Sequence, residues 1–192
     1  VTPLTVKMNP YPVIVKNVLS VCDFGNDGSE TIILSSLNSQ LVSSTNGFTF
    51  TYFLTEKDAL NSQNPQTSYN LNASSELYVK IASGADCFLI QKINFKFLPP
   101  PSVYNQTIDI CDNNDDNQEI VNLTLYEKDL TGNSGDTYSF SYFSTYDNAY
   151  TNKQVITNPK SYTLRNFPVT IYVRITNASS CFSIAELTFR TA

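Results

Sequence analysis

Four cysteines are the side chains of this sequence best suited to covalent chemistry: Cys22, Cys87, Cys111 and Cys181. The sequence contains no histidine, which excludes Ser–His–Asp triads, Cys–His pairs and histidine metal ligands. It also has no C-x-x-C pair, and this disfavours a zinc site. We therefore expect the cysteines in disulfides, with free buried thiols as the alternative. No acidic residue lies in a distinctive catalytic motif, so we expect that the protein is not an enzyme.

Two acidic loops, Asp23–Glu30 and Asp112–Glu119, are the candidate metal sites. Oxygen ligands at every second position suit a hard cation such as calcium, the one cofactor we consider. A loop of Asp, Asn and Gly is also typical of a plain solvated turn. The second loop departs from the EF-hand pattern at Asn117 and Leu123. The candidate ligands are Asp112, Asn114 and Asp116, with Asp23 and Asp27 in the first loop.

A strand-like segment followed by a cysteine occurs twice. Leu77–Ile81 precedes Cys87–Ile90, and Ile171–Ile175 precedes Cys181–Ile184. The gap is the same in both copies, since 87 − 81 = 6 and 181 − 175 = 6. A match in order, spacing and residue type predicts two copies of one module.

Three consecutive prolines, Pro99–Pro101, separate the two copies. Proline fixes φ and cannot donate to a ladder, so it stops strand pairing and makes a short, stiff linker. We place the modules at residues 1–98 and 99–192. Residues 4–8 repeat the strand that precedes the linker. Residues 1–9 are therefore either the start of the first module or the last strand of a preceding repeat in a longer array.

Each module holds two cysteines in equivalent places. The separations within a module are 87 − 22 = 65 and 181 − 111 = 70 residues. We predict the pairs Cys22–Cys87 and Cys111–Cys181. Closing loops of this length is worth about 4 kcal/mol each when the entropy of the unfolded chain is counted. Disulfides also imply export to an oxidising, extracellular setting.

Alternating patterns predict an all-β fold. Phe48–Phe53 and Tyr138–Phe143 alternate aromatic and hydroxyl residues, as half-buried antiparallel strands do. A helical period is never sustained: Ser35–Leu41 and Tyr126–Leu130 could each hold one helical turn, and we expect loops after Thr55 and Thr145. About seven short strands per module indicate two tandem immunoglobulin-like (Ig-like) or fibronectin-like antiparallel β-sandwich modules joined by a Pro-rich linker. The predicted strands are 18–21, 31–34, 48–53, 69–71, 77–81, 87–90 and 93–97 in the first module, and 107–110, 120–123, 138–143, 162–164, 171–175, 181–184 and 187–190 in the second.

Composition limits the partners. The formal net charge of −5 argues against nucleic acid and against anionic membrane surfaces, which both need clustered Lys and Arg. No apolar run reaches the ~18 residues that a membrane-spanning helix needs, so we expect no membrane insertion. Four tyrosines could stack on sugar rings, although tyrosine on a strand is more often packed in the core or at its rim. They are Tyr52, Tyr142, Tyr146 and Tyr150.

These motifs resemble a known repeat type. The matching residues are Cys111-Asp112, Ser141–Phe143, Asn158-Pro159 and Ile171–Ile184, with their first-module equivalents. Together they resemble the tandem Ig-like repeats of large Bacteroidota surface proteins that the type IX secretion system exports, among them gliding-motility adhesins of the SprB type. The first module departs from the pattern at Asp23–Gly25, which weakens a shared metal function for both loops.

The resemblance implies a stalk or spacer segment of a secreted bacterial cell-surface adhesin, acting in gliding motility or surface attachment. Its partners would be neighbouring repeats of the same chain and an extracellular polysaccharide or other surface. It carries no catalytic residues to transfer. The alternative is a polysaccharide- or protein-binding module of a secreted multidomain protein.

Overall fold

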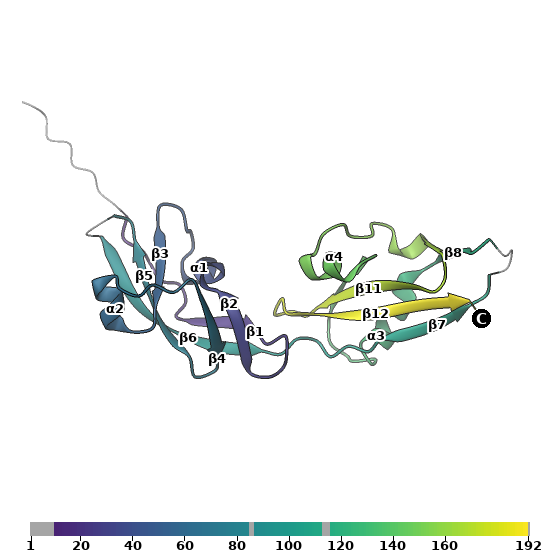
Figure 1. Ribbon diagram of the computed structural model, residues 1–192, viewed down its shortest axis with the longest axis horizontal. Helices are drawn as coiled ribbons and strands as arrows, with labels where there is room; N and C mark the ends of the chain where they lie inside the picture. The colour runs from purple at the N-terminus through teal and green to yellow at the C-terminus, as the bar shows by residue number, and fades with distance from the viewer. Residues whose placement is uncertain (1–9, 85–86, 113–115, 192) are drawn as a thin grey trace, which may run out of the picture. The chain divides into compact units, whose positions relative to one another are not determined.

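The computed structural model describes residues 10–84, 87–112 and 116–191. The chain forms two compact units, Val1–Leu98 and Pro99–Ala192. The strands and α-helices of the two units follow the same order along the chain, and most of them are labelled in Figure 1. The strand predicted at residues 4–8 lies outside the described residues.

Unit 1 is built from two β-sheets. In its described part the first sheet has the order β1-β6-β5-β3, and the second pairs β2 with β4. β1 runs parallel to β6, and every other neighbouring pair is antiparallel. The strands are β1 (Val18–Cys22), β2 (Ser29–Ile33), β3 (Thr49–Phe53), β4 (Ser68–Asn72), β5 (Glu76–Ala82) and β6 (Phe88–Leu98).

Unit 2 repeats this topology. Its described sheets have the orders β7-β12-β11-β9 and β10-β8, with β7 parallel to β12. The strands are β7 (Gln106–Ile110), β8 (Gln118–Val121), β9 (Ser139–Phe143), β10 (Tyr162–Arg165), β11 (Val169–Thr176) and β12 (Phe182–Thr191). The predicted all-β fold of two tandem Ig-like sandwiches is confirmed.

The core of each unit follows from alternation along the strands. In β5, Leu77, Val79 and Ile81 are fully buried while the residues between them are partly exposed. Side chains of alternate residues point to opposite faces of a sheet, so one face of β5 supplies the core. β11 does the same with Ile171, Val173 and Ile175. Each unit therefore has a hydrophobic core of its own.

The described strands number six in each unit rather than about seven. Residues 87–90 and 93–97 were predicted as two strands, but they form one long strand, β6. Gln91 and Lys92 interrupt the apolar pattern without breaking the pairing, since they lie opposite Val79 and Tyr78 of β5. β12 merges the two corresponding strands of unit 2 in the same way.

Two short helices were wrongly predicted as loops: α2 (Glu56–Asn61) and α4 (Tyr146–Thr151). Thr55 caps α2, because its hydroxyl accepts the N–H of Asp58 at 3.1 Å. Thr145 caps α4 in the same manner, from the N–H of Asn148 at 3.2 Å. A Thr followed three residues later by a polar residue is a helix-start signal, but six residues are too few to show a helical period.

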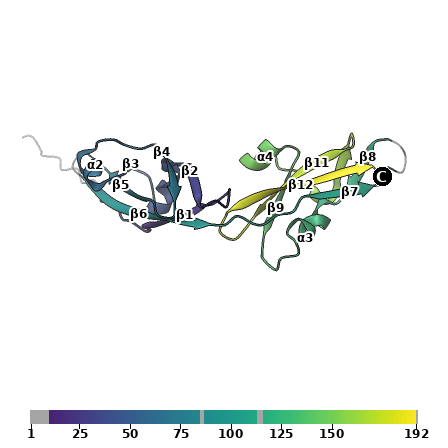
Figure 2. The same ribbon diagram turned by 60° about the horizontal axis from the view of Figure 1, so that its bottom comes forward.

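The predicted single helical turns are present. They are η1 (Leu34–Leu37) with α1 (Asn38–Leu41), and η2 (Leu123–Tyr126) with α3 (Glu127–Leu130). A further 3-10 turn, η3, spans Pro159–Ser161. Figure 2 shows α2 and α4 lying against the sheets of their own units. None of the helices described is long and apolar enough to cross a membrane.

Candidate functional site

The two cysteines of unit 1 lie at opposite ends of β6. Cys22 is opposite Leu98 in the parallel pairing of β1 with β6, whereas Cys87 directly precedes the first residue of that strand. β6 has 11 residues, and a strand of that length separates its ends by about 30 Å or more. A disulfide needs Cα atoms closer than about 7 Å. The predicted pair Cys22–Cys87 is therefore wrong.

Unit 2 shows the same separation. Cys111 directly follows β7, whose Ile110 lies opposite Thr191 at the end of β12. Cys181 directly precedes β12, which has 10 residues. The predicted pair Cys111–Cys181 is wrong for the same reason.

The disulfide instead joins residues of different units. Cys22 and Cys181 are the disulfide-bonded cysteines, and they are bonded to each other. Cys87, which is half-buried, and Cys111, which is exposed, are free thiols. The expectation of a disulfide is confirmed. The other two cysteines are free, but neither is buried, so they do not match the alternative of free buried thiols.

A closed turn holds Cys181 in place. The Asn177 side-chain oxygen accepts the N–H groups of Ser179 and Cys181 at 3.0 and 3.1 Å. The Asn177 N–H donates to the Cys181 carbonyl at 2.9 Å. Ser180 adopts a left-handed conformation with φ of 66°, which closes the turn. Cys181 is fully buried, so its sulfur is shielded from solvent.

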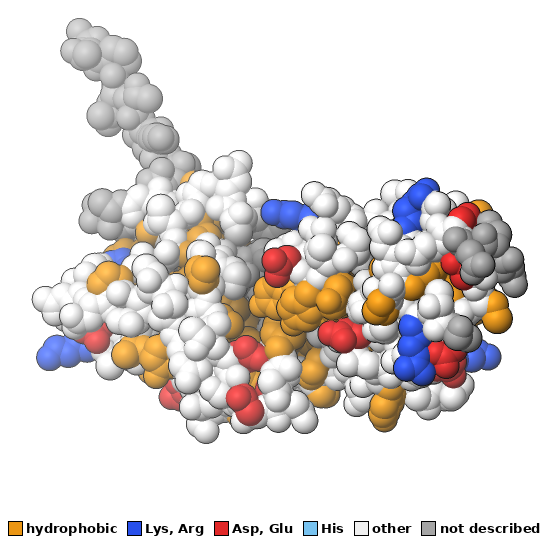
Figure 3. All heavy atoms as spheres, turned by 45° about the vertical axis from the view of Figure 1, so that its right-hand side comes forward, with side chains coloured by type: hydrophobic (Ala, Val, Ile, Leu, Met, Phe, Trp, Pro, Cys, Tyr) orange, Lys and Arg blue, Asp and Glu red, His pale blue; other side chains and the backbone are white. Residues whose placement is uncertain are grey.

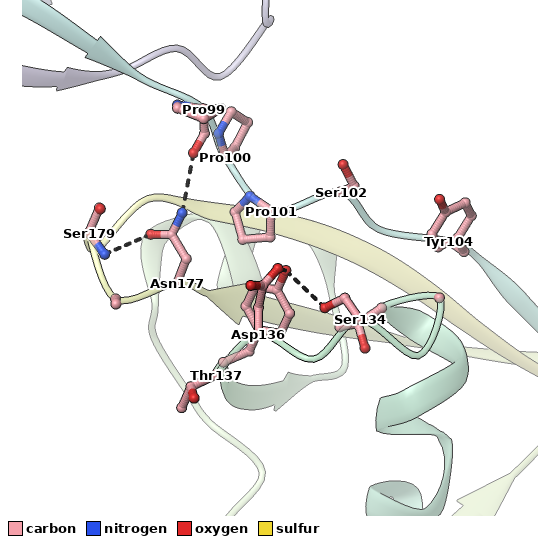
Figure 4. Close-up of a pocket in the computed structure, with 14 residues that line it drawn as sticks. Pro99, Pro100, Pro101, Ser102, Tyr104, Ser134, Asp136, Thr137, Asn177 and Ser179 are labelled. Atoms are coloured by element: carbon pink, nitrogen blue, oxygen red, sulfur yellow. Dashed lines mark hydrogen bonds between the residues drawn. The ribbon is translucent and has the colours of Figure 1, made fainter.

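The proline linker is bonded to this turn (Figure 4). The Asn177 side-chain amide donates to the Pro99 carbonyl at 3.2 Å, and the Ser183 hydroxyl donates to the Pro101 carbonyl at 2.7 Å. Pro99, Pro101 and Asn177 also border a pocket of about 700 Å³ in unit 2. Asp136 is the only charged side chain in its lining among the described residues, so the pocket does not offer an anion site.

Cys87 lies in a matching environment in unit 1. The Ser83 N–H donates to the Cys87 carbonyl at 3.0 Å, and the Ser83 hydroxyl donates to the Pro10 carbonyl at 2.6 Å. The Cys87 sulfur lies 3.8 Å from the same carbonyl. Pro10 is equivalent to Pro99, since 99 − 10 = 89 is the offset between the copies of this segment. Cys87 and Cys181, the second cysteine of each module, therefore lie beside the segment by which the chain enters their unit.

The acidic loop of unit 1 is a self-satisfied turn. Asp23 is 7% exposed, and its two carboxylate oxygens accept the N–H groups of Asp27 at 3.0 Å and Gly28 at 2.8 Å. Asp27 accepts the Ser29 N–H at 2.9 Å, and Glu30 accepts the N–H of Phe24. These carboxylates serve the backbone of the loop, as the turn interpretation predicts.

The loop of unit 2 is described only in part. Asp112 accepts the Asn117 N–H at 2.8 Å, and Asp116 accepts the Gln118 N–H at 2.9 Å. Asn114 lies outside the described residues. In the part of the chain that the structure describes, no group of three or more acidic, Cys or His side chains could hold a metal ion. Calcium binding by Asp112, Asn114 and Asp116, and by Asp23 and Asp27 of the first loop, stays a prediction.

Two of the four candidate sugar-stacking tyrosines are core residues. Tyr52 is 2% exposed and Tyr142 is 3% exposed. Their hydroxyls donate to the side chains of Asn38 at 2.7 Å and Glu127 at 2.6 Å, respectively. Burial raises the pKa of both phenols above the usual value. The prediction that they could stack on a ligand is wrong, since their rings are covered.

The other two tyrosines belong to an exposed group on unit 2. We call Tyr146, Tyr150, Tyr172 and Phe182 the aromatic cluster. Tyr146 and Tyr150 are 51% and 56% exposed, and their rings are nearly parallel with centroids 6.3 Å apart. Tyr172 and Phe182 make edge contacts with Tyr146 and Tyr150, both at 6.0 Å.

Arg174 fixes the cluster against the sheet. Its guanidinium carbon lies 3.3 Å from the centroid of the Phe182 ring, and it donates to the Ala149 and Tyr150 carbonyls at 2.9 Å. Desolvation lowers the pKa of this guanidinium. Unit 1 carries Lys80 over Phe88 at 4.0 Å in the equivalent place, but α2 has Glu and Leu where α4 has the two exposed tyrosines.

The visible surface carries few charges. In Figure 3 uncharged side chains and backbone predominate, hydrophobic side chains are exposed in patches, and Lys and Arg are scattered rather than clustered. That face offers no continuous basic stripe of the kind that nucleic acid requires.

A family comparison now accounts for the cysteine pattern. Residues 17–101 and 107–192 each match the family described as the Flavobacterium inter-domain disulphide bond domain. The protein belongs to this family, in two tandem copies. The bond between Cys22 and Cys181 is an inter-domain disulfide in the sense of that description. The coarser part of the sequence prediction, a Bacteroidota Ig-like tandem repeat of an extracellular protein, is thereby confirmed.

Solved structures add little to this assignment. One match is the human desmocollin-1 ectodomain, with 13% identity, a TM-score of 0.27 and coverage of 97% of this chain and 38% of that chain. Another is Sidekick-1 immunoglobulin domains 1–5, with 9% identity, a TM-score of 0.26 and the same coverage. The chain thus spans 38% of the length of these structures. No curated protein matches the sequence.

Proposed function

We propose that this protein is a structural segment in the stalk of a secreted Flavobacterium surface adhesin. The observation that carries the proposal is the Cys22–Cys181 disulfide, which links consecutive modules covalently. The two modules are also joined through the Pro99–Pro101 peptide. Two covalent connections between neighbours suit a spacer that must stay intact while its ends are pulled apart.

The disulfide changes the path along which tension travels. Load applied to the two ends of the chain can pass from Cys22 directly to Cys181. The peptide between the two cysteines, 181 − 22 = 159 residue steps long, lies outside this path. It bears no load even after either unit opens. A stalk protected in this way extends little under force even when a module unfolds.

Export and surface attachment rest on chemistry and resemblance together. A disulfide between structural modules persists in an oxidising compartment and not in a reducing cytoplasm. Type IX secretion, SprB-like architecture and a part in gliding motility come from the repeat resemblance alone. Neighbouring repeats of the same chain are the partners that this role requires.

A replacement experiment in the producing bacterium tests the stalk. The two modules are exchanged, within the full-length parent protein, for two unrelated Ig-like modules of similar length, and in a second strain they are deleted. We expect antibody labelling of intact cells in both strains and near-normal attachment in the replacement strain. Loss of attachment on replacement, with surface display unchanged, would show that these modules bind the target themselves.

The aromatic cluster favours a second candidate, a polysaccharide-binding module. Two half-exposed tyrosine rings held nearly parallel on a short helix present flat apolar faces that can stack on sugar rings. Their hydroxyl groups can bond to a polar ligand. The double substitution of Tyr146 and Tyr150 by Ala should then abolish retention on a glycan array. The matched control is Leu60→Ala, because Leu60 of unit 1 occupies the position that Tyr150 occupies in unit 2. An array without any signal for the unmodified protein would dismiss this candidate.

A further inference from the structure

We propose that the pocket in unit 2 bordered by Tyr104, Asp136 and Asn177 binds a sugar that carries a free amino group. The ligand class is an amino sugar with a primary ammonium group, as in a chain of glucosamine residues. The inference goes beyond the stalk function and does not depend on it. The site is also separate from the aromatic cluster, since no residue of that cluster is among those that line the pocket in the described part of unit 2.

The pocket has the size of a ligand site. Its volume of about 700 Å³ lies within the ~300–1,000 Å³ that is typical of small-molecule pockets. Three stretches of unit 2 contribute to it, residues 99–104, 131–138 and 177–179. Figure 4 shows side chains of all three stretches around one space. A ligand held there would therefore contact the linker, a loop and the turn before β12 at the same time.

The wall of the pocket is rich in hydrogen-bond acceptors. Pro99, Pro100 and Pro101 present carbonyl oxygens to it but have no N–H group to donate. Asp136 adds a carboxylate, the only charged side chain in the described lining. A primary ammonium group is a cation with three donors. It therefore complements this wall both in charge and in hydrogen bonding.

A chain of hydroxyl groups holds the Asp136 carboxylate in place. The Ser134 hydroxyl lies 3.3 Å from the Tyr138 hydroxyl and donates to it, and the Tyr138 hydroxyl donates to Oδ2 of Asp136 at 3.0 Å. In the described part of the chain no group donates to the other oxygen, Oδ1, and the side chain is exposed. One oxygen thus orients the carboxylate, and the other is available to a ligand.

Tyr104 supplies a flat face beside the carboxylate. Its side chain is 55% exposed, and its ring lies so close to Gly132 that a Cβ there would come within 2.7 Å of it. Gly132 also has a φ of 61°, so both the turn and the ring require glycine at this position. A tyrosine ring combines an apolar face with a polar hydroxyl, which suits the C–H face and the hydroxyl groups of a sugar.

Hydroxyl groups line the rest of the pocket. Ser102, Thr137 and Ser179 each contribute one, and a hydroxyl can both donate and accept. These groups match the hydroxyl groups of a sugar ring. A lysine side chain would bring the ammonium group on a narrow apolar stem and leave them without partners. The lining therefore favours an amino sugar over a lysine of a partner protein.

Unit 1 shows that the fold does not require the Tyr104 ring. Val15 is the equivalent of Tyr104, because the Val15 N–H donates to the Leu41 carbonyl at 2.8 Å and the Tyr104 N–H donates to the Leu130 carbonyl at 2.9 Å. The backbone arrangement is thus the same in both units, while the aromatic face is present only in unit 2.

The carboxylate and its supporting phenol are also specific to unit 2. Tyr138 and Phe48 are equivalent, since each directly precedes the corresponding strand, β9 or β3. Two residues earlier, unit 2 has Asp136 and unit 1 has Asn46. The charge, the hydroxyl that orients it and the ring of Tyr104 are therefore absent together from unit 1, as expected of groups that serve a ligand rather than the fold.

A titration of the isotope-labelled two-module protein tests the inference. The probe is the β-1,4-linked trimer of glucosamine, and the comparison probes are the fully N-acetylated trimer and Nα-acetyl-lysine amide. NMR shifts of the backbone N–H groups report both the place and the strength of binding. We expect the glucosamine trimer to shift residues 131–138 and 177–179. The acetylated trimer should bind about tenfold more weakly or worse, because acetylation removes the charge of the amine.

Matched variants assign the binding to the pocket. Asp136→Asn keeps the shape of the side chain and should weaken trimer binding about tenfold. Glu186→Gln changes the net charge equally at an exposed position of β12 outside the pocket and should leave binding unchanged. Tyr104→Val introduces the residue that unit 1 carries, and it should weaken binding by removing the ring face. The labelled spectra show directly that each variant is folded.

Four results would overturn the inference. They are no binding of the glucosamine trimer, equal binding of the acetylated trimer, an unchanged affinity in Asp136→Asn, and shifts confined to the aromatic cluster. Binding of Nα-acetyl-lysine amide at the same N–H groups, as tight as that of the trimer, would overturn the sugar assignment and indicate a lysine side chain instead. None of these results bears on the stalk, whose test is the replacement of the modules in the bacterium.

Discussion

Reduction of the Cys22–Cys181 disulfide should lengthen the protein under load by an amount that the sequence separation sets. In the oxidised protein, only 22 − 1 = 21 residues before the bond and 192 − 181 = 11 after it can extend between the pulled ends. Reduction returns the intervening 159 residue steps (181 − 22) to the load path. At ~3.3–3.6 Å per residue, the released chain measures about 520–570 Å, before the folded length of the two units is subtracted.

The assay is force spectroscopy of the two-module protein, held by its two ends, with and without a reducing agent. We expect the reduced protein to extend in two steps, one for each unit, because each unit has a core of its own. The oxidised protein should show neither step. Cys22→Ser should behave as reduced in both conditions, whereas the double variant Cys87→Ser/Cys111→Ser should behave like the unmodified protein. Two full steps in the oxidised, unmodified protein would refute the reasoning, since the bond would then not bypass the units.

Three further predictions concern stability. Tyr142→Phe should destabilise unit 2 by about 1.5–3 kcal/mol, because it removes a hydrogen bond to a carboxylate. Tyr52→Phe should destabilise unit 1 by only about 1 kcal/mol, because the partner of Tyr52 is a neutral amide. Urea unfolding of each variant measures these changes. The raised pKa values of the Tyr52 and Tyr142 phenols keep both groups neutral in the folded protein, whereas tyrosine in the unfolded chain ionises near pH 10. The free energy of unfolding should therefore be unaffected below that pH and fall above it, by up to about 1.4 kcal/mol per pH unit for each tyrosine. Both Phe variants should flatten this alkaline decline. Thr145→Ala removes the cap of α4 and should cost about 1 kcal/mol, whereas Thr145→Ser should cost much less; thermal unfolding compares them.

The fold was largely predictable from the sequence because its signals are local and repeated. Alternation of apolar and polar residues along Glu76–Ala82 and Val169–Thr176 indicates which faces of these strands are buried. The sequence repeat predicts that both units share one topology. The errors fall where an element is too short to show its period, or where a strand contains polar residues that interrupt its apolar pattern. The helices α2 and α4 are shorter than two full turns, and Gln91 and Lys92 read as a strand boundary although they stay paired within β6.

The candidate sites were less predictable, since the partner of a polar side chain depends on the folded arrangement. Asp23 has the side chain of a metal ligand, and its two carboxylate oxygens accept backbone N–H groups of its own loop, which the residue types of the loop do not reveal. Tyr52 and Tyr146 are equally aromatic, yet one faces the core and the other faces solvent. Residue type alone does not decide between these environments.

The pairing of the cysteines shows why equivalence between repeats can mislead. Four cysteines allow three connectivities, and two equivalent cysteines per module fit a bond within modules as well as a bond between them. The length of the last strand decides: β6 and β12 hold the two cysteines of a unit at opposite ends, one beside the entering chain and one beside the departing chain. A bond within the unit is then out of reach, and the cysteine at the exit of one unit and the cysteine at the entrance of the next both adjoin the linker. An inter-module disulfide therefore follows from strand length and chain direction together, and the same two properties would apply at every junction of a longer array.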